Sequence, residues 1–268
     1  MSATTPQSGV ARLAEAFAAR RRPAALMPYV MGGFPTLADS LAIARACIEV
    51  GADVIELGVP YSDPLADGPV IQAAGARALA GGADLAGVLE VARAIAPEVP
   101  VVVMAYANMV LAPGAQRFLE RLRIAGASGL IVPDLPLEES GRLRAIADAL
   151  GIALVPLIAP TTPQRRLAQI AACARGFLYL VSVTGTTGER SLEELRYAEL
   201  IAAARPHTQL PLALGFGIAS AEHARAAVQA GAEGVVIGSR LVRAAEAAER
   251  PAEAVAEVLA RIAEGLVR

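Results

Sequence analysis

A chain of 268 residues, 55% of them hydrophobic, is long enough to bury a large core in one α/β domain or in two small ones. Its net charge of −2 arises from acidic residues and arginines mixed along the chain, and the lack of a basic stripe argues against nucleic acid as a partner. All 24 basic residues are arginine, and without lysine no side chain can form a Schiff base with a carbonyl substrate or with pyridoxal phosphate.

The longest apolar stretch, residues 99–113, is interrupted by a proline and an asparagine and is shorter than the roughly 20 residues of a membrane-spanning helix. The 2 histidines fall in or beside helical segments, so a metal site built on clustered histidines is not expected. Cys47 and Cys173 lie in helix-like apolar patterns and are interpreted as small buried hydrophobes in a reducing compartment. We therefore expect a cytoplasmic protein without membrane or nucleic-acid contacts.

An amphipathic segment over residues 8–24 predicts a helix that caps the chain before its first strand. Beyond it, eight runs rich in Val, Ile and Leu alternate with stretches of helical spacing, and each run is continuously apolar, as strands buried on both faces are. Thr36 and Gly51 bound the helix after the first strand, and Ser220 caps the helix after the seventh. The predicted strands are Leu26–Met31, Val54–Gly58, Val101–Tyr106, Gly129–Val132, Ile152–Ile158, Phe177–Ser182, Leu210–Gly215 and Gly234–Gly238.

Eight strand–helix units in a chain of this length predict a (β/α)8 TIM barrel, which is an α/β fold. A doubly wound open sheet has the same alternation and the same right-handed crossovers. The barrel is favoured because there are eight units and because no Gly-rich dinucleotide fingerprint follows the first strand. No linker, low-complexity segment or charge block divides the chain, so residues 1–268 are expected to form a single domain, with residues 1–24 as N-terminal helix and lead-in.

In such a barrel, function lies on the loops at the C-terminal ends of the strands. Glu56 lies near that end of the second predicted strand and shares its face parity with Val54 and Gly58. If this face points into the barrel, apolar surroundings raise the pKa of the carboxyl group and suit it to donate and accept a proton. In the other interpretation Glu56 points outward and is hydrogen-bonded beneath a helix, and the sequence leaves both open.

Other polar residues near strand ends are weaker candidates. Asp67 follows on a loop stiffened by prolines, which positions a side chain at little entropic cost, whereas Asp63 lies in an "SDP" pattern typical of a turn. Tyr106 and Tyr179 fall at the ends of the third and sixth predicted strands, where each could line an aromatic pocket or donate a hydrogen bond. Tyrosines that only pack are common, so the two are supporting evidence.

Gly-rich segments follow the last three predicted strands. They are "GTTGER" (185–190), "GFG" (215–217) and "IGSR" (237–240). Backbone N–H groups in such loops, together with a helix N-terminus, hold phosphate groups in many barrels, and glycine lets the main chain approach the anion closely. The residues therefore favour a phosphate-bearing small molecule handled by carboxylates, without a metal ion or a Schiff base, as in proton-transfer-driven bond cleavage or isomerisation.

The segment "ADVIELGVPYSDPLADGP" (52–69) closely resembles the signature of the tryptophan synthase alpha chain family. The similarity extends over most of the chain, with one motif at or after nearly every predicted strand. These motifs are "PYVMGGFPT", "MAYANMV", "GLIVPDLPLEE", "APTTP", "YLVSVTGTTGER", "LGFGI" and "VVIGSR". The resemblance implies a lyase of tryptophan biosynthesis that cleaves indole-3-glycerol phosphate to indole and glyceraldehyde 3-phosphate by a retro-aldol step.

The resemblance also implies roles for individual residues. Glu56 matches the family's acid/base, Asp67 the carboxylate that stabilises charge at the indole N–H, and Tyr179 an active-site tyrosine. The other matches bind substrate or phosphate: Gly188, Gly217, Gly238 and Ser239 at the phosphate, Phe216 and Tyr106 in the pocket walls, and Thr187 in the loop that closes over the substrate. No cofactor and no metal ion are implied. Tyr61 stands where the family usually has Phe, which implies an altered loop or partner contact. Thr186 stands where it usually has Val, which implies different kinetics of the loop that closes over the substrate.

The family works as an αββα complex, an alpha2beta2 heterotetramer that passes indole through a tunnel to a beta chain using pyridoxal phosphate. The resemblance therefore implies this beta chain as partner, docked through residues 60–67 and "YANMVLAPG" (106–114). Three alternatives stay open. A stand-alone lyase would release free indole, a phosphosugar isomerase would share the Gly-rich loops but leaves "ELGVPYSDPLADGP" unexplained, and a non-catalytic regulatory subunit is disfavoured by the intact Glu56 and Asp67.

Overall fold

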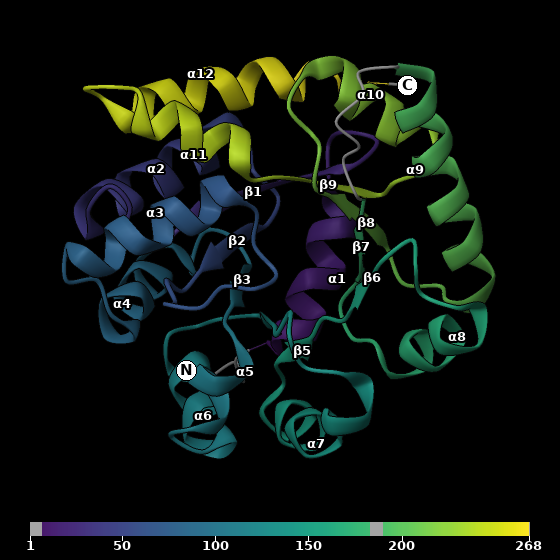
Figure 1. Ribbon diagram of the computed structural model, residues 1–268, viewed down its shortest axis with the longest axis horizontal. Coiled ribbons are helices and arrows are strands. Elements are labelled where there is room, and N and C mark those ends of the chain that lie inside the picture. Colours follow the sequence, from purple (N-terminus) through teal and green to yellow (C-terminus); the bar gives the residue numbers. More distant parts are fainter. Residues whose placement is uncertain (1–6, 183–189, 268) are drawn as a thin grey trace, which may run out of the picture.

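The computed structural model describes residues 7–182 and 190–267, and its strands form one curled parallel sheet with helices around it (Figure 1). The strand order is β5-β4-β3-β2-β1-β9-β8-β7-β6. The strands are β1 (Ala25–Met31), β2 (Ile55–Gly58), β3 (Val101–Met104), β4 (Gly129–Ile131), β5 (Ala153–Leu154), β6 (Leu157–Ile158), β7 (Leu178–Val181), β8 (Leu212–Gly215) and β9 (Gly234–Ile237).

One helix precedes the first strand, and the others follow the strands and cover the outer face of the sheet (Figure 1). They are α1 (Gly9–Ala19), α2 (Leu37–Val50), α3 (Pro69–Ala80), α4 (Leu85–Ile95), α5 (Ala107–Leu111), α6 (Ala115–Ile124), α7 (Gly141–Leu150), α8 (Gln164–Cys173), α9 (Arg190–Ala204), α10 (Ala221–Gln229), α11 (Ser239–Glu246) and α12 (Pro251–Ala263), with short 3-10 turns at Leu137–Glu139 and Arg205–His207. None of the helices in the described ranges combines the length and the apolar character that crossing a membrane requires.

The fifth predicted strand is divided into β5 and β6. β5 pairs with β4 and β6 pairs with β7, and residues Val155 and Pro156 lie between them. Pro156 has no N–H to donate, but its carbonyl accepts a hydrogen bond of 3.2 Å from the Tyr179 N–H. The continuous chain therefore bridges the two edges of the sheet. The predicted (β/α)8 barrel is confirmed, with its fifth strand in two short segments.

Alternate residues of each strand point into the barrel, as the pleat of a β-strand requires. The interior cluster includes Val54 of the segment entering β2 and Val102 of β3, both fully buried. Glu56 has the same parity as Val54 and lies opposite Val102 on one side and Tyr29 of β1 on the other. This register decides between the two interpretations of Glu56, because it directs the carboxyl group into the barrel.

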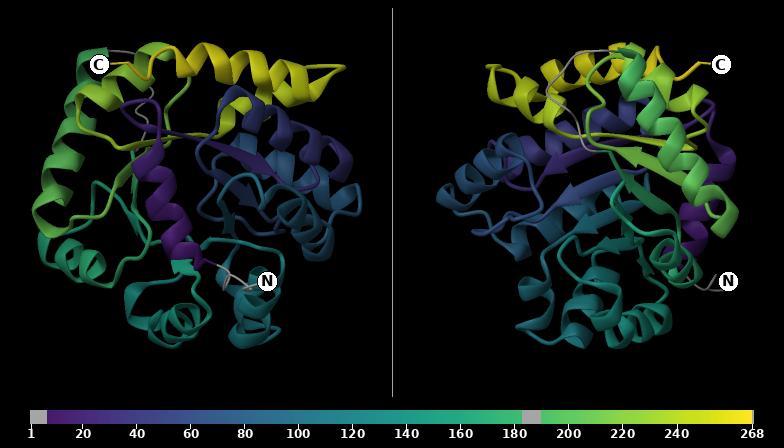
Figure 2. Two further views of the ribbon diagram at one scale, coloured as in Figure 1. Left: turned by 180° about the vertical axis from the view of Figure 1, so that it is seen from behind. Right: turned by 45° about the vertical axis from the view of Figure 1, so that its right-hand side comes forward.

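Helix α1 closes the barrel at the N-terminal ends of the strands, so the predicted capping helix is confirmed. Leu13 and Phe17 are buried in the interior cluster, and the Phe17 ring lies 5.6 Å from that of Phe177, the residue before β7. Gly9 permits the close approach, since a Cβ atom there would lie 2.2 Å from the carbonyl oxygen of Ser128. The view from behind shows α1 across this end of the barrel (Figure 2, left).

Local signals in the sequence set the helix ends. The Thr36 hydroxyl accepts from the Asp39 N–H at the start of α2, and Gly51 ends that helix in the left-handed region at φ 94°. Ser220 caps α10 in the same way, as predicted. The predicted burial of the cysteines is correct for Cys47 and wrong for Cys173, which is only partly buried because it ends α8 beside a cavity.

Candidate active site

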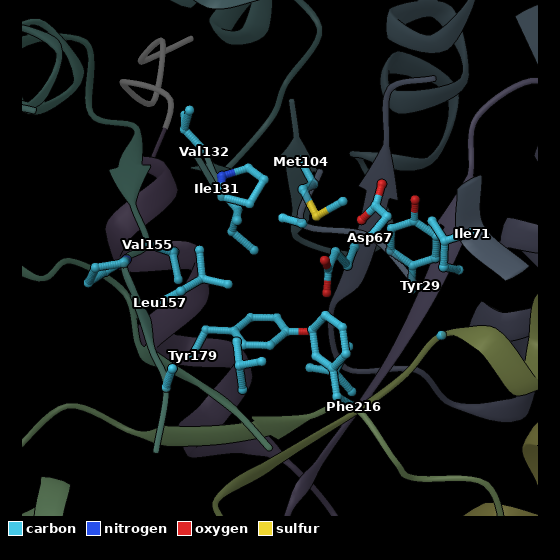
Figure 3. Close-up of a pocket in the computed structure, with 18 of the residues that line it drawn as sticks. Tyr29, Asp67, Ile71, Met104, Ile131, Val132, Val155, Leu157, Tyr179 and Phe216 are labelled. Atoms are coloured by element: carbon cyan, nitrogen blue, oxygen red, sulfur yellow. The ribbon is translucent and has the colours of Figure 1, made fainter. Parts of the chain in front are cut away.

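A cavity of about 680 Å³ opens where the strands end, within the size range of small-molecule sites. Residues of every strand but β8 line it, together with the loop after β8. Its middle is apolar: Ile71, Met104, Ile131, Val155 and Leu157 surround the space between Tyr29, Asp67 and Tyr179 (Figure 3). A flat aromatic ring fits such walls because it buries apolar surface on both faces. The polar lining residues come from several different strands, loops and helices and include Glu56, Asp67, Thr162, Arg166 and Ser239.

Glu56 is the most deeply buried carboxyl group in this cavity, with 3% of its surface exposed. Its Oε2 atom is buried and has no hydrogen-bond partner. Burial and the nearby charge of Asp67 raise its pKa to about 8, while a hydrogen bond from Tyr179 acts in the opposite direction. A carboxyl group with that pKa is protonated in roughly nine molecules of ten at pH 7. Glu56 is thus a neutral acid in the lining of the cavity, with one oxygen that has no hydrogen-bond partner.

Asp67 lies on the loop between β2 and α3 and is half-buried. Burial raises its pKa to about 6, and a hydrogen bond from the Tyr106 hydroxyl limits the rise. Tyr106 is held in turn, because its hydroxyl accepts from the Ala66 N–H at 3.1 Å and its ring stacks on Tyr61 at 5.0 Å between centroids. Asp67 is therefore mostly ionised at pH 7, and the cavity contains one protonated and one ionised carboxyl group.

Tyr179 projects inward from β7 and is 4% exposed. Burial and the charge of Glu56 raise the pKa of its phenol well above the usual value, so the hydroxyl stays protonated. Its position depends on Gly215 of β8: a Cβ atom there would lie 2.3 Å from the Tyr179 hydroxyl oxygen. In Figure 3 the Tyr179 ring points into the cavity beside Phe216.

The loops after β8 and β9 form the polar end of the cavity. Phe216 and Gly217 follow β8 with φ of 67° and 81°, so a non-glycine residue occupies the left-handed region. The Ser182 hydroxyl donates to the Phe216 carbonyl at 2.7 Å and holds this turn. Gly238 and Ser239 line the cavity where α11 begins, which leaves main-chain N–H groups facing it. This end can receive an anion.

Comparison with known proteins agrees with this geometry. The family model described as tryptophan synthase alpha chain matches residues 16–266. The tryptophan synthase alpha chain of Synechococcus sp. (strain CC9902) is 50% identical over 221 residues, 82% of each chain, and that of Prochlorococcus marinus (strain MIT 9313) is 48% identical over 226 residues, 84% of this chain and 82% of that one. The chain belongs to the tryptophan synthase alpha chain family.

Solved structures show the same relation. A chain of Mycobacterium tuberculosis tryptophan synthase superposes with a TM-score of 0.88 at 34% identity, covering 98% of this chain and 100% of that chain. The tryptophan synthase A-subunit of Pyrococcus furiosus superposes with a TM-score of 0.84 at 34% identity, covering 90% of this chain and 98% of that chain. The alpha chain fold and the sequence family therefore agree over nearly the whole molecule.

Most of the residues that the alpha chain signature singled out meet in the one cavity. The lining includes Glu56, Asp67, Tyr179, Phe216, Gly217, Gly238 and Ser239. Tyr106, predicted in a pocket wall, is not among the described residues that line the cavity. Its hydroxyl is instead hydrogen-bonded to the Asp67 carboxylate. The predicted Thr187 and Gly188 lie outside the described residues, as does Thr186.

Two residues of the site were not predicted. Tyr29 lines the cavity beside Asp67 and is 5% exposed, and Ser182 holds the turn at Phe216. Tyr29 had a signal in the sequence, because it stands two residues before the end of the first strand with the parity of Met27, an interior residue. Ser182 had none, since its partner belongs to a loop 34 residues away.

Proposed function

We propose that this alpha chain family member cleaves indole-3-glycerol phosphate into indole and glyceraldehyde 3-phosphate by a retro-aldol reaction, with Glu56 as its acid/base. The supporting observation is one cavity in which Glu56 has a pKa of about 8 and Asp67 a pKa of about 6. Neighbouring carboxyl groups whose environments separate their pKa values are suited to different roles in proton transfer.

Glu56 performs two proton transfers in this proposal. The protonated carboxyl group donates its proton to ring carbon 3 of the indole, which interrupts the aromatic system. The resulting carboxylate then accepts the proton of the hydroxyl group on the adjacent glycerol carbon. The carbon–carbon bond breaks, its electron pair restores the indole, and an aldehyde forms. The unpartnered Oε2 atom supports this role, because a buried acceptor without a partner is open to the substrate.

Asp67 stabilises the intermediate. Protonation at ring carbon 3 places positive charge at the ring nitrogen, and an ionised carboxylate beside the N–H lowers the energy of that state. The hydrogen bond from Tyr106 supports this role because it favours the charged form of Asp67. Tyr179 keeps the Glu56 carboxylate oriented once its proton has left.

The phosphate group lies at the opposite end of the cavity, against Gly217, Gly238 and Ser239. Main-chain N–H groups at the start of α11 and the Ser239 hydroxyl are the donors in this proposal. Placing the phosphate there leaves the apolar middle of the cavity for the ring. Thr187 and Gly188 complete the phosphate site in the proposal by their match to the family motif.

The experiment that tests the function measures indole release from indole-3-glycerol phosphate by the wild-type chain and by Glu56→Gln. We expect the variant to lose indole formation while it still binds glycerol phosphate. Glu49→Gln, an exposed glutamate on α2, is the control and should keep wild-type activity. Cleavage by Glu56→Gln near the wild-type rate would contradict the acid/base assignment.

We also propose a tryptophan synthase beta chain as partner, in an alpha2beta2 heterotetramer of the cytoplasm. Exposed apolar side chains near the cavity mouth support a docking surface: Leu65 on the β2–α3 loop is 89% exposed and Leu111 on α5 is 50% exposed. Two free cysteines fit a reducing compartment. Turnover measured with and without a beta chain separates a subunit, whose rate rises with the partner, from a stand-alone lyase, whose rate does not.

A further inference from the structure

The Tyr29 hydroxyl is a buried polar group with a poor partner. It lies in the cavity at 5% exposure, and the contact it makes is with the Met31 sulfur at 3.9 Å. A thioether is a weak acceptor, whereas buried tyrosine hydroxyls normally reach a strong one. Two strong acceptors, the carboxyl groups of Glu56 and Asp67, line the same cavity.

Gly58 fixes where this hydroxyl lies. A Cβ atom on Gly58 would be 2.1 Å from the Tyr29 hydroxyl oxygen and 2.6 Å from its Cζ atom, so the phenol reaches from β1 over the C-terminal end of β2. The chain leaves β2 at this point for the loop that carries Asp67. Figure 3 shows Tyr29 and Asp67 side by side, and the charge of Asp67 has a larger effect on the phenol than that of Glu56.

Asp67 already has one phenol partner. The Tyr106 hydroxyl bonds to the carboxylate from the segment between β3 and α5, and it is fixed there by the Ala66 N–H. A carboxylate has two oxygens and about four acceptor positions, so one phenol does not satisfy it. The Tyr29 phenol is drawn beside the same carboxyl group (Figure 3), and the charge of Asp67 acts on it.

We propose that Tyr29 is a positioning residue for Asp67, and that its hydroxyl turns from the Met31 thioether to the carboxylate when Asp67 ionises. The two phenols, from β1 and from the segment before α5, then hold the carboxylate from two sides. The inference rests on the proposed function for its catalytic consequence: Asp67 is kept ionised and directed at the ring nitrogen. Tyr29 itself need not touch the reacting atoms.

The direction of the effect follows from the state that the hydrogen bond favours. A donor to the carboxylate stabilises the charged form and lowers the pKa of Asp67, so loss of the Tyr29 hydroxyl raises that pKa. The contact with the Met31 thioether favours the protonated form of Asp67, because the Tyr29 hydroxyl bonds to this sulfur when Asp67 is neutral. Loss of the sulfur therefore lowers the pKa. The other titratable or charged groups near this carboxyl group are Glu56, Tyr179, Arg240 and Arg243 in the cavity lining, and Tyr106, which bonds to Asp67 from outside that lining.

The test is a ¹³C NMR titration of the Asp67 carboxyl in the full chain labelled at aspartate, with the signal assigned by its loss in Asp67→Asn. We expect Tyr29→Phe to raise the pKa of Asp67 by roughly half a pH unit or more, and Met31→Leu to shift it by a smaller amount downward. Tyr197→Phe, which removes a buried hydroxyl on α9 outside the cavity lining, should leave it unchanged. A Tyr29→Phe shift below about 0.2 units, or shifts of the same sign in both variants, overturns the proposal.

The activity arm uses the same variants. In Tyr29→Phe the acid limb of kcat/KM for indole-3-glycerol phosphate moves to higher pH by the same amount, so the loss of kcat/KM relative to the wild type is larger at pH 6 than at pH 7.5. A variant that lost kcat at every pH without a shift of the limb would be a structural effect and would count against the proposal. If the wild type releases no indole, the proposed function fails, while the titration still decides the role of Tyr29.

Discussion

Replacement of Glu56 by glutamine should make the stability of this protein less dependent on pH. The carboxyl group has a pKa of about 8 in the folded chain and an ordinary value of 4.5, so the folded state holds the proton more tightly than the unfolded state. The stability that Glu56 contributes as a neutral acid is complete below pH 4.5 and is lost as the pH rises through 8. Glutamine cannot ionise, so the variant does not lose stability in this way as the pH rises.

The magnitude follows from the two pKa values. Each pH unit corresponds to about 1.4 kcal/mol, so the interval from 4.5 to about 8 corresponds to roughly 4 to 5 kcal/mol in the free energy of unfolding. Between pH 5.5 and 8 the difference between Glu56→Gln and the wild type should change by roughly 3 kcal/mol in favour of the variant. The amide at the unpartnered Oε2 position adds a cost, but that cost does not vary with pH.

Urea unfolding of both proteins at several pH values from 5.5 to 8.5 measures this difference. The slope with pH is the diagnostic quantity, because a general packing defect shifts all values equally. Glu49→Gln on α2 should follow the wild type at every pH. If the difference between Glu56→Gln and the wild type were constant across this range, the reasoning that burial keeps Glu56 protonated would be refuted.

The remaining predictions concern activity. The profile of kcat/KM against pH should be a bell with limbs near pH 6 and 8, since Asp67 must be ionised and Glu56 protonated; a single limb would show that one of them is not required. Asp67→Asn should lower kcat by about 100-fold or more and move the alkaline limb to lower pH, because the Asp67 charge helps to raise the pKa of Glu56. Gly215→Ala, whose Cβ would lie 2.3 Å from the Tyr179 hydroxyl, should lower both activity and thermal stability, while Gly141→Ala, with nothing within 4 Å, should change neither. Gly238→Val should weaken binding of glycerol phosphate by isothermal titration far more than Gly238→Ala, whose Cβ makes an ordinary contact of 3.7 Å with Tyr29; equal affinities would remove the anion site from this loop.

The sequence by itself determined the elements of this protein and its family. Continuous apolar runs separated by capped helices predict the strands of a barrel, because a strand covered on both faces must be apolar on both. Thr36, Gly51 and Ser220 act on the chain next to them, so their effect can be recognised without the fold. The signature over residues 52–69 placed Glu56 in one strand and Asp67 in the loop that follows it.

Only the tertiary structure decided how those residues act. Whether Glu56 faces the interior depends on the register with β1 and β3. Its pKa depends first on burial and then on Asp67 and Tyr179, which come from another loop and another strand. Tyr29 joins the site because Gly58 on the neighbouring strand has no side chain. The division of the fifth strand also depends on tertiary structure, because its first part, β5, pairs with β4 and its second part, β6, pairs with β7. Such properties arise between residues distant in the chain, and a linear pattern does not contain them.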